Sequence, residues 1–196
     1  MSVPHAPTRN WNSPNVITGI RMLLTPLCFW LVVSGGEAGA ARWWGAVLFI
    51  VAISTDWVDG FLARRNNQVT DLGKLLDPIA DKLLTGAALV SLSLLSELPW
   101  WVTIIILVRE IGVTVDRLVR ANSHVVIAAA WMGKLKTLVQ AVAISLALLP
   151  LESLWGSWIV PVDVVLMSLA VVLTVLSGLD YVRTAVASRT RPSPQA

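Results

Sequence analysis

The chain has 196 residues, of which 56% are hydrophobic and 14% charged, and its mean hydropathy is +0.72. This apolar excess excludes an ordinary soluble domain, and the formal net charge is only +3. We expect one domain, because about six spanning helices of roughly 20 residues each would use most of a chain this long. No nucleic-acid partner is expected. The single cysteine, Cys28, excludes an internal disulfide and a cysteine-cluster zinc site.

The two ends of the chain differ from its apolar middle. Residues 1–15 are polar and proline-rich, and the stretch after them has no convincing small-residue cleavage site, so no cleaved signal peptide is expected. We expect this segment to lie at the membrane interface as part of one membrane-embedded domain covering residues 1–185. Residues 186–196 are basic and rich in proline, which predicts a disordered tail.

Six apolar windows are long enough to cross a bilayer. In chain order they cover roughly residues 16–33, 43–61, 75–95, 100–118, 128–149 and 158–182. Tryptophans near their ends support this count, because indole rings prefer the headgroup level. The sequence therefore predicts an all-α integral membrane protein with six transmembrane helices.

Basic residues are distributed unequally between the connections. When successive connections are assigned to alternate sides of the membrane, one side receives only Arg42 and the other receives eleven basic residues. Positively charged connections tend to stay in the cytoplasm, which predicts a protein of the inner membrane with both termini cytoplasmic. Arg21, Lys82 and Arg109 fall inside proposed spans, in the halves nearer the cytoplasm.

Four aspartates recur at helical spacing around the connection between the second and third windows. Asp56 and Asp59 are three residues apart and Asp77 and Asp81 are four apart, so each pair shares a helix face. A single such aspartate could equally cap a helix or form an ion pair. The whole array requires cations instead, because ionised carboxylates at contact distance repel one another.

Carboxylate oxygens suit hard divalent cations, and two such ions about 4 Å apart suit phosphoryl or phosphodiester displacement. Basic residues in the same connection, Arg64, Arg65 and Lys74, would add affinity for phosphate. The sequence thus predicts a divalent-cation site that faces the cytoplasm and handles a phosphorylated substrate.

The stretch reads D-x2-D-G-x2-A-R-x8-G-x3-D-x3-D, beginning at Asp56 and ending at Asp81. Every position resembles the signature of the CDP-alcohol phosphatidyltransferase family. The resemblance implies a six-helix membrane enzyme, usually a homodimer, and the distribution of basic residues predicts that its active site faces the cytoplasm. Such an enzyme transfers a phosphatidyl group from CDP-diacylglycerol to an alcohol and releases CMP.

The resemblance also implies roles for individual residues. Two divalent cations, Mg²⁺ or Mn²⁺, would be held by Asp56, Asp59, Asp77 and Asp81. Asp81 would in addition be the general base that takes a proton from the acceptor hydroxyl. The CDP-diacylglycerol site implied by the signature comprises Asp59, Gly60, Ala63, Arg64 and Gly73.

Further segments resemble the phosphatidylglycerophosphate synthase branch, whose acceptor is glycerol 3-phosphate. These segments are "PNVITGIR", "LDPIADKLL", "VREIGVTVDRLVR" and "GKLKT". The acceptor's own phosphate needs cations, and a guanidinium within a span must pair or line a polar cavity. The predicted phosphate-binding residues are Arg109 and Lys134, followed by Arg117 and Lys136.

Several alternatives stay open at this point. The acceptor could be inositol phosphate, phosphatidylglycerol to give cardiolipin, or serine, and a divalent-cation transporter is a remote possibility. Arg109 and Glu110 could form an intramembrane ion pair, and the other basic residues could be ordinary cytoplasmic charge. His124 is expected to be solvated, and no role is assigned to Asp163.

Overall fold

The structure is a computed structural model that describes residues 13–65, 71–120 and 131–189. Within these ranges, the side chains of residues 13–15, 56–65, 71–75, 117, 119, 120 and 186–189 lie outside the description. The described residues form helices and short connections without a β-strand. The helices are α1 (Ser13–Gly35), α2 (Ala40–Arg65), α3 (Asp71–Leu94), α4 (Trp100–Arg120), α5 (Trp131–Leu148), α6 (Glu152–Trp155) and α7 (Ile159–Arg189).

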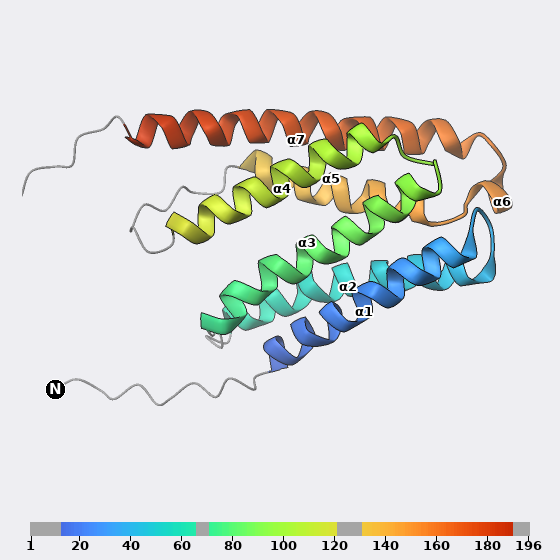
Figure 1. The fold of residues 1–196 in the computed structure, drawn as a ribbon, viewed down its shortest axis with the longest axis horizontal. Helices are drawn as coiled ribbons and strands as arrows, with labels where there is room; N and C mark the ends of the chain where they lie inside the picture. Colours follow the sequence, from blue (N-terminus) through green and yellow to red (C-terminus); the bar gives the residue numbers. More distant parts are fainter. Residues whose placement is uncertain (1–12, 66–70, 121–130, 190–196) are drawn as a thin grey trace, which may run out of the picture.

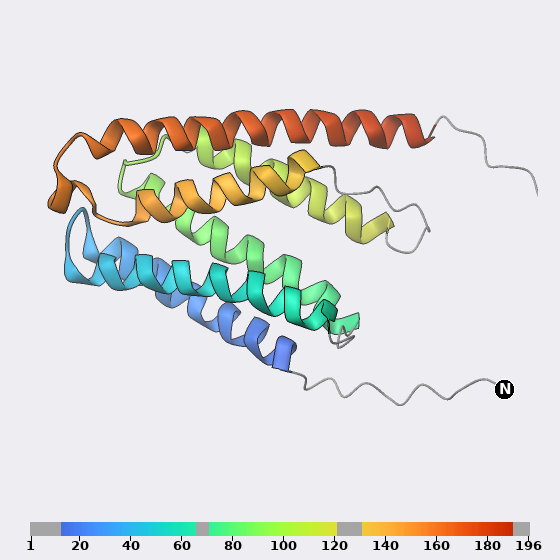
Figure 2. The same cartoon turned by 180° about the vertical axis from the view of Figure 1, so that it is seen from behind.

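The six long helices run alternately up and down and form an elongated bundle (Figure 1). Helix α1 packs against α2 and α3, α5 packs against α7, and α4 lies against α3 and α7. The two halves meet where α5 contacts α2 and α3. Figure 2 shows the same arrangement from behind, with the end of α2 and the start of α3 at one end of the bundle.

Each predicted apolar window overlaps one long helix, so the all-α prediction is confirmed for the described residues. Two of these helices contain stretches that are long and apolar enough to cross a membrane, Val16–Gly35 in α1 and Ile159–Ala185 in α7. Helix α2 contributes a shorter apolar stretch, Ala40–Thr55. The count of six spans and the cytoplasmic position of both termini stay predictions.

The helices around the aspartate signature are longer than their apolar windows. Helix α2 continues to Arg65 and α3 already begins at Asp71, so Arg64 and Lys74 are helical. The prediction that Arg64, Arg65 and Lys74 lie in the connection between the two helices was therefore wrong, because a helix can continue past the end of its apolar stretch. Pro78 lies inside α3, where it leaves one backbone carbonyl without its usual helical donor.

The C-terminal helix also extends further than expected. Helix α7 ends at Arg189, four residues beyond the predicted domain boundary at residue 185. The remainder of the predicted tail, residues 190–196, lies outside the described residues.

An apolar core runs along the bundle and connects all six long helices. Helices α1 and α2 approach closely at Gly45, where a Cβ atom would lie 2.7 Å from the Val32 Cγ2 atom. Cys28 donates its thiol hydrogen to the Gly45 carbonyl at 3.4 Å. Small residues permit this kind of close backbone approach between helices. The core residues include Cys28, Val32, Ala46, Phe49, Leu84, Leu89, Leu92, Ile106, Ile144, Leu148 and Ala170.

Arg42 joins three connections at the end of the bundle opposite the aspartate signature. Its side chain is 3% exposed, forms an ion pair with Glu97, and donates to the backbone carbonyls of Gly36, Ala147 and Leu148. Each of these carbonyls lies at or near a helix end, where intrahelical donors are missing. This arginine therefore has a structural role.

Candidate active site

The aspartate signature spans the last turns of α2 and the first turns of α3. Asp56 and Asp59 lie on α2, and Asp77 and Asp81 lie on α3. Helix geometry places Asp56 and Asp59 on one face of α2, one turn apart. The side chains of Asp56, Asp59, Gly60, Ala63, Arg64 and Gly73 lie outside the description.

Asp77 and Asp81 are the signature aspartates whose side chains are described. Asp77 is exposed, and the Asp81 side chain is 25% exposed. The described side chains include no group of three His, Cys, Asp or Glu residues that could hold a metal ion. Because two of the four predicted ligands are outside this set, the shared cation site stays a prediction, and all-carboxylate donors would suit Mg²⁺ or Mn²⁺.

A threonine on α1 positions Asp77. Thr18 is 3% exposed, and its hydroxyl donates to the Asp77 Oδ1 atom at 2.5 Å. A hydrogen bond of this kind fixes the orientation of a carboxylate that is proposed to bind metal. The sequence did not predict this contact, although Thr18 lies in the "PNVITGIR" segment that resembles the synthase branch.

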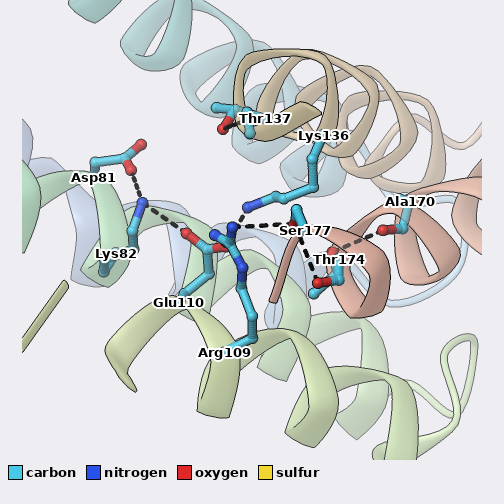
Figure 3. Close-up of polar contacts among 10 residues, drawn as sticks. Asp81, Lys82, Arg109, Glu110, Lys136, Thr137, Ala170, Thr174 and Ser177 are labelled. Atoms are coloured by element: carbon cyan, nitrogen blue, oxygen red, sulfur yellow. Dashed lines mark hydrogen bonds and ion pairs between the residues drawn. The ribbon is translucent and has the colours of Figure 1, made fainter. Parts of the chain in front are cut away.

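Asp81 is connected to a second charged cluster by the next residue in the chain. Lys82 forms an ion pair with Asp81 and another with the Glu110 Oε2 atom of α4 at 2.9 Å. Figure 3 shows the Lys82 ammonium group between the two carboxylates. Lys82 thus joins the proposed general base to the interior of the bundle.

Glu110 is the centre of this buried charged cluster. Its Oε1 atom accepts a hydrogen bond from Arg109 Nη1 at 2.9 Å and another from Lys136 of α5. Arg109 also donates to the Ser177 hydroxyl of α7 at 3.0 Å (Figure 3). Glu110 is 4% exposed and Lys136 is 1% exposed. We call Lys82, Arg109, Glu110 and Lys136 the Glu110 cluster.

A cavity of about 10 Å³ lies beside the Glu110 cluster, which is room for about one water molecule. Its lining includes Asp81, Lys82, Glu110, Lys136 and Gln140. The structure therefore brings the proposed base, the half-buried Lys82 and the buried Lys136 to the same small polar space.

The structure places the four predicted acceptor-binding residues in different surroundings. Arg109 and Lys136 lie together in the Glu110 cluster, and the ion pair between Arg109 and Glu110 that the sequence left open is present. Lys134 is exposed on α5, two residues before the buried Lys136. The Arg117 side chain lies outside the description. The phosphate-binding role of all four residues stays a prediction.

Lys82, Glu110 and Gln140 were not predicted as site residues. The signal that could have identified Lys82 and Glu110 is their charge within apolar windows, since an ionisable residue at such a position is a functional candidate by default.

Asp163 lies away from this site. Asp163 lines a cavity of about 510 Å³ at the opposite end of the bundle, together with Glu97 and Arg42. His124 lies outside the described residues. Neither residue is given a part in the chemistry.

These features define an all-helical protein with a charged polar site at one end of its bundle. The family model for CDP-alcohol phosphatidyltransferase matches residues 11–176. The chain therefore belongs to the CDP-alcohol phosphatidyltransferase family, as the signature indicated, and is a phosphatidyltransferase enzyme. Because the chain belongs to this enzyme family, the hypothesis of a divalent-cation transporter is dropped.

Relatives in three bacteria match most of the chain. A "Probable phosphatidylglycerophosphate synthase" of Mycobacterium tuberculosis (strain ATCC 25618 / H37Rv) is 48% identical over 179 residues, which cover 89% of this chain and 82% of the relative. The "CDP-diacylglycerol--glycerol-3-phosphate 3-phosphatidyltransferase" of Bacillus subtilis (strain 168) is 41% identical over 184 residues, covering 87% and 93%. The protein with that name in Escherichia coli (strain K12) is 37% identical over 187 residues, covering 89% and 95%.

Proposed function

We propose that the protein transfers the phosphatidyl group of CDP-diacylglycerol to glycerol 3-phosphate and forms phosphatidylglycerophosphate and CMP. The names of its relatives in three bacteria support this acceptor. The observation that carries the proposal is the Glu110 cluster, which gathers three buried or half-buried cations beside Asp81. A phosphorylated acceptor needs cations of this kind, whereas an uncharged acceptor does not.

In the proposed reaction, Asp81 takes the proton from the acceptor hydroxyl as general base. The hydroxyl oxygen forms a bond to the phosphorus that carries diacylglycerol, and the bond from that phosphorus to the CMP oxygen breaks. Arg109, Lys136 and Lys82 hold the phosphate of the acceptor, so that its hydroxyl lies close to Asp81. Lys134 and Arg117 are proposed to attract the acceptor from the cytoplasm.

The signature residues hold the other substrate. Asp59, Gly60, Ala63, Arg64 and Gly73 are proposed to bind CDP-diacylglycerol, since glycines allow a ligand to approach the backbone closely. Bound Mg²⁺ or Mn²⁺ on Asp56, Asp59, Asp77 and Asp81 would neutralise the diphosphate and the charge that develops on CMP. Thr18 keeps the Asp77 carboxylate in place for this purpose.

We propose a homodimeric protein of the inner membrane, with both termini and the active site facing the cytoplasm. The excess of basic residues on one side of the predicted spans supports this orientation.

An acceptor panel tests the proposed function. Purified full-length protein in detergent receives CDP-diacylglycerol, Mg²⁺ and one acceptor at a time, and CMP release is measured. Glycerol 3-phosphate is expected to support the fastest release, well above inositol phosphate, phosphatidylglycerol and serine. CMP release with one of those three acceptors but not with glycerol 3-phosphate would refute the proposed acceptor.

A further inference from the structure

Three basic side chains from three helices meet at one buried carboxylate. Glu110 of α4 contacts Lys82 of α3, Arg109 of α4 and Lys136 of α5, as Figure 3 shows. Glu110 and Lys136 are almost fully buried, with 4% and 1% of their surfaces exposed. The contacts hold the three cations in one place although they repel one another.

This arrangement is poorly explained as a device for stability. A buried ion pair contributes little net stability, because the loss of hydration offsets the attraction between the charges. One cation would also suffice to balance Glu110. Asp81, which Lys82 also contacts, brings the number of carboxylates to two, so the three cations leave one surplus positive charge. Such a surplus favours an anion, and a phosphate monoester carries about −1.5 to −2 at neutral pH.

Two buried polar atoms, one belonging to the Glu110 cluster and one to a residue that lines the cavity, are candidates to contact a ligand. The Arg109 Nε and Gln140 Oε1 atoms are buried and have no hydrogen-bond partner in the part of the chain that the structure describes. Gln140 is 5% exposed and lines the small cavity beside Glu110. A buried donor or acceptor without a partner is unfavourable, and a phosphorylated alcohol has oxygens for Arg109 and a hydroxyl for Gln140.

From these observations we infer that Glu110 is a positioning residue for the acceptor phosphate. This inference rests on the proposed function. Glu110 holds Lys82, Arg109 and Lys136 together before the acceptor arrives, and the phosphate then binds to the assembled cations. The cavity is too small for a phosphate, so a cation side chain has to shift as the acceptor enters, and Lys82, the most exposed of the three at 23%, can do so while it stays in contact with the phosphate.

The inference predicts a selective effect of Glu110→Gln. The amide keeps the size of the side chain but removes the charge that gathers the cations, so acceptor binding weakens. The KM for glycerol 3-phosphate is expected to rise at least about tenfold, as the loss of hydrogen bonds to a charged group implies. The KM for CDP-diacylglycerol is expected to change less than about twofold, and kcat at saturating acceptor less than about threefold.

Steady-state CMP release by the full-length protein measures these constants, and Glu97→Gln is the matched control. Glu97 also forms an ion pair with a buried cation, Arg42, but at the opposite end of the bundle. The control is expected to lower the thermal unfolding midpoint and to leave both KM values unchanged. Equal changes of the two KM values in Glu110→Gln, or no change in either, would overturn the inference.

A second variant covers the case in which Glu110→Gln does not fold. Glu110→Asp keeps the buried charge but shortens the side chain, so it cannot reach all three cations, and the KM for glycerol 3-phosphate is expected to rise about threefold or more. If Glu110→Asp has the constants of the unaltered protein while Glu110→Gln is unfolded, Glu110 is a structural ion-pair residue and the inference fails.

The unaltered protein separates this inference from the proposed function. If it uses another phosphorylated acceptor in place of glycerol 3-phosphate, the proposed acceptor is wrong, and the same split between the KM values is then expected for that acceptor. If it uses an uncharged acceptor only, both the proposed function and the role of Glu110 are refuted.

Discussion

The hydrogen bond from Thr18 to Asp77 predicts a specific defect in metal binding. Thr18→Val keeps the shape of a side chain that is 3% exposed and removes the hydroxyl that donates to Asp77 Oδ1 at 2.5 Å. A hydrogen bond to a charged group contributes about 1.5–3 kcal/mol. Because Asp77 is exposed, water can replace the lost donor in part, so the lower value applies, which is roughly tenfold in affinity.

The assay is CMP release as a function of Mg²⁺ concentration at saturating substrates. The half-saturating Mg²⁺ concentration is expected to rise roughly tenfold in Thr18→Val, with most of the rate recovered at high Mg²⁺. Thr25→Val is the matched control, because Thr25 is also buried on α1 but donates only to the Arg21 carbonyl of its own helix. If the two variants required the same Mg²⁺ concentration, Asp77 would not be a metal ligand that Thr18 orients.

Three further variants test the base and the packing. Asp81→Asn is expected to abolish turnover while CDP-diacylglycerol still shifts the thermal unfolding midpoint, and an equal loss of binding would argue against a general base. Gly45→Ala places a methyl group 2.7 Å from the Val32 side chain and is expected to lower the free energy of unfolding by about 1–3 kcal/mol, measured by urea denaturation; an unchanged value would contradict the close packing. Arg42→Met leaves Glu97 unpaired and is expected to cost about 3 kcal/mol in the same assay, with normal activity of the folded fraction; loss of activity in folded protein would show that Arg42 has more than a structural role.

The sequence predicted the helices well because each long apolar stretch favours a helix, which satisfies its own backbone hydrogen bonds. All six windows correspond to helices, but their ends near the signature were placed too early or too late. Arg65 and Asp71 are charged residues that continue or begin a helix outside its apolar stretch. Hydropathy cannot detect such turns, because they contain no apolar excess.

The aspartate array could be proposed from the sequence because its members are close in sequence and recur at helical spacing, and its shared cation site stays a prediction. The contacts of Thr18 and Glu110 were not, because each depends on how two or three helices pack against one another. The same reason explains why the sequence could not tell which of the proposed acceptor-binding lysines is buried. Lys134 and Lys136 are two residues apart on α5, and only the rotation of that helix in the bundle decides that Lys136 is the buried one.

The most direct measurement follows an isotope label from the acceptor into the lipid. Purified protein is incubated with CDP-diacylglycerol, Mg²⁺ and glycerol 3-phosphate labelled with ¹³C, and the lipids and CMP are quantified by mass spectrometry. We expect labelled phosphatidylglycerophosphate and CMP in equal amounts. CMP without labelled lipid, or neither product, would contradict the proposed transfer to glycerol 3-phosphate.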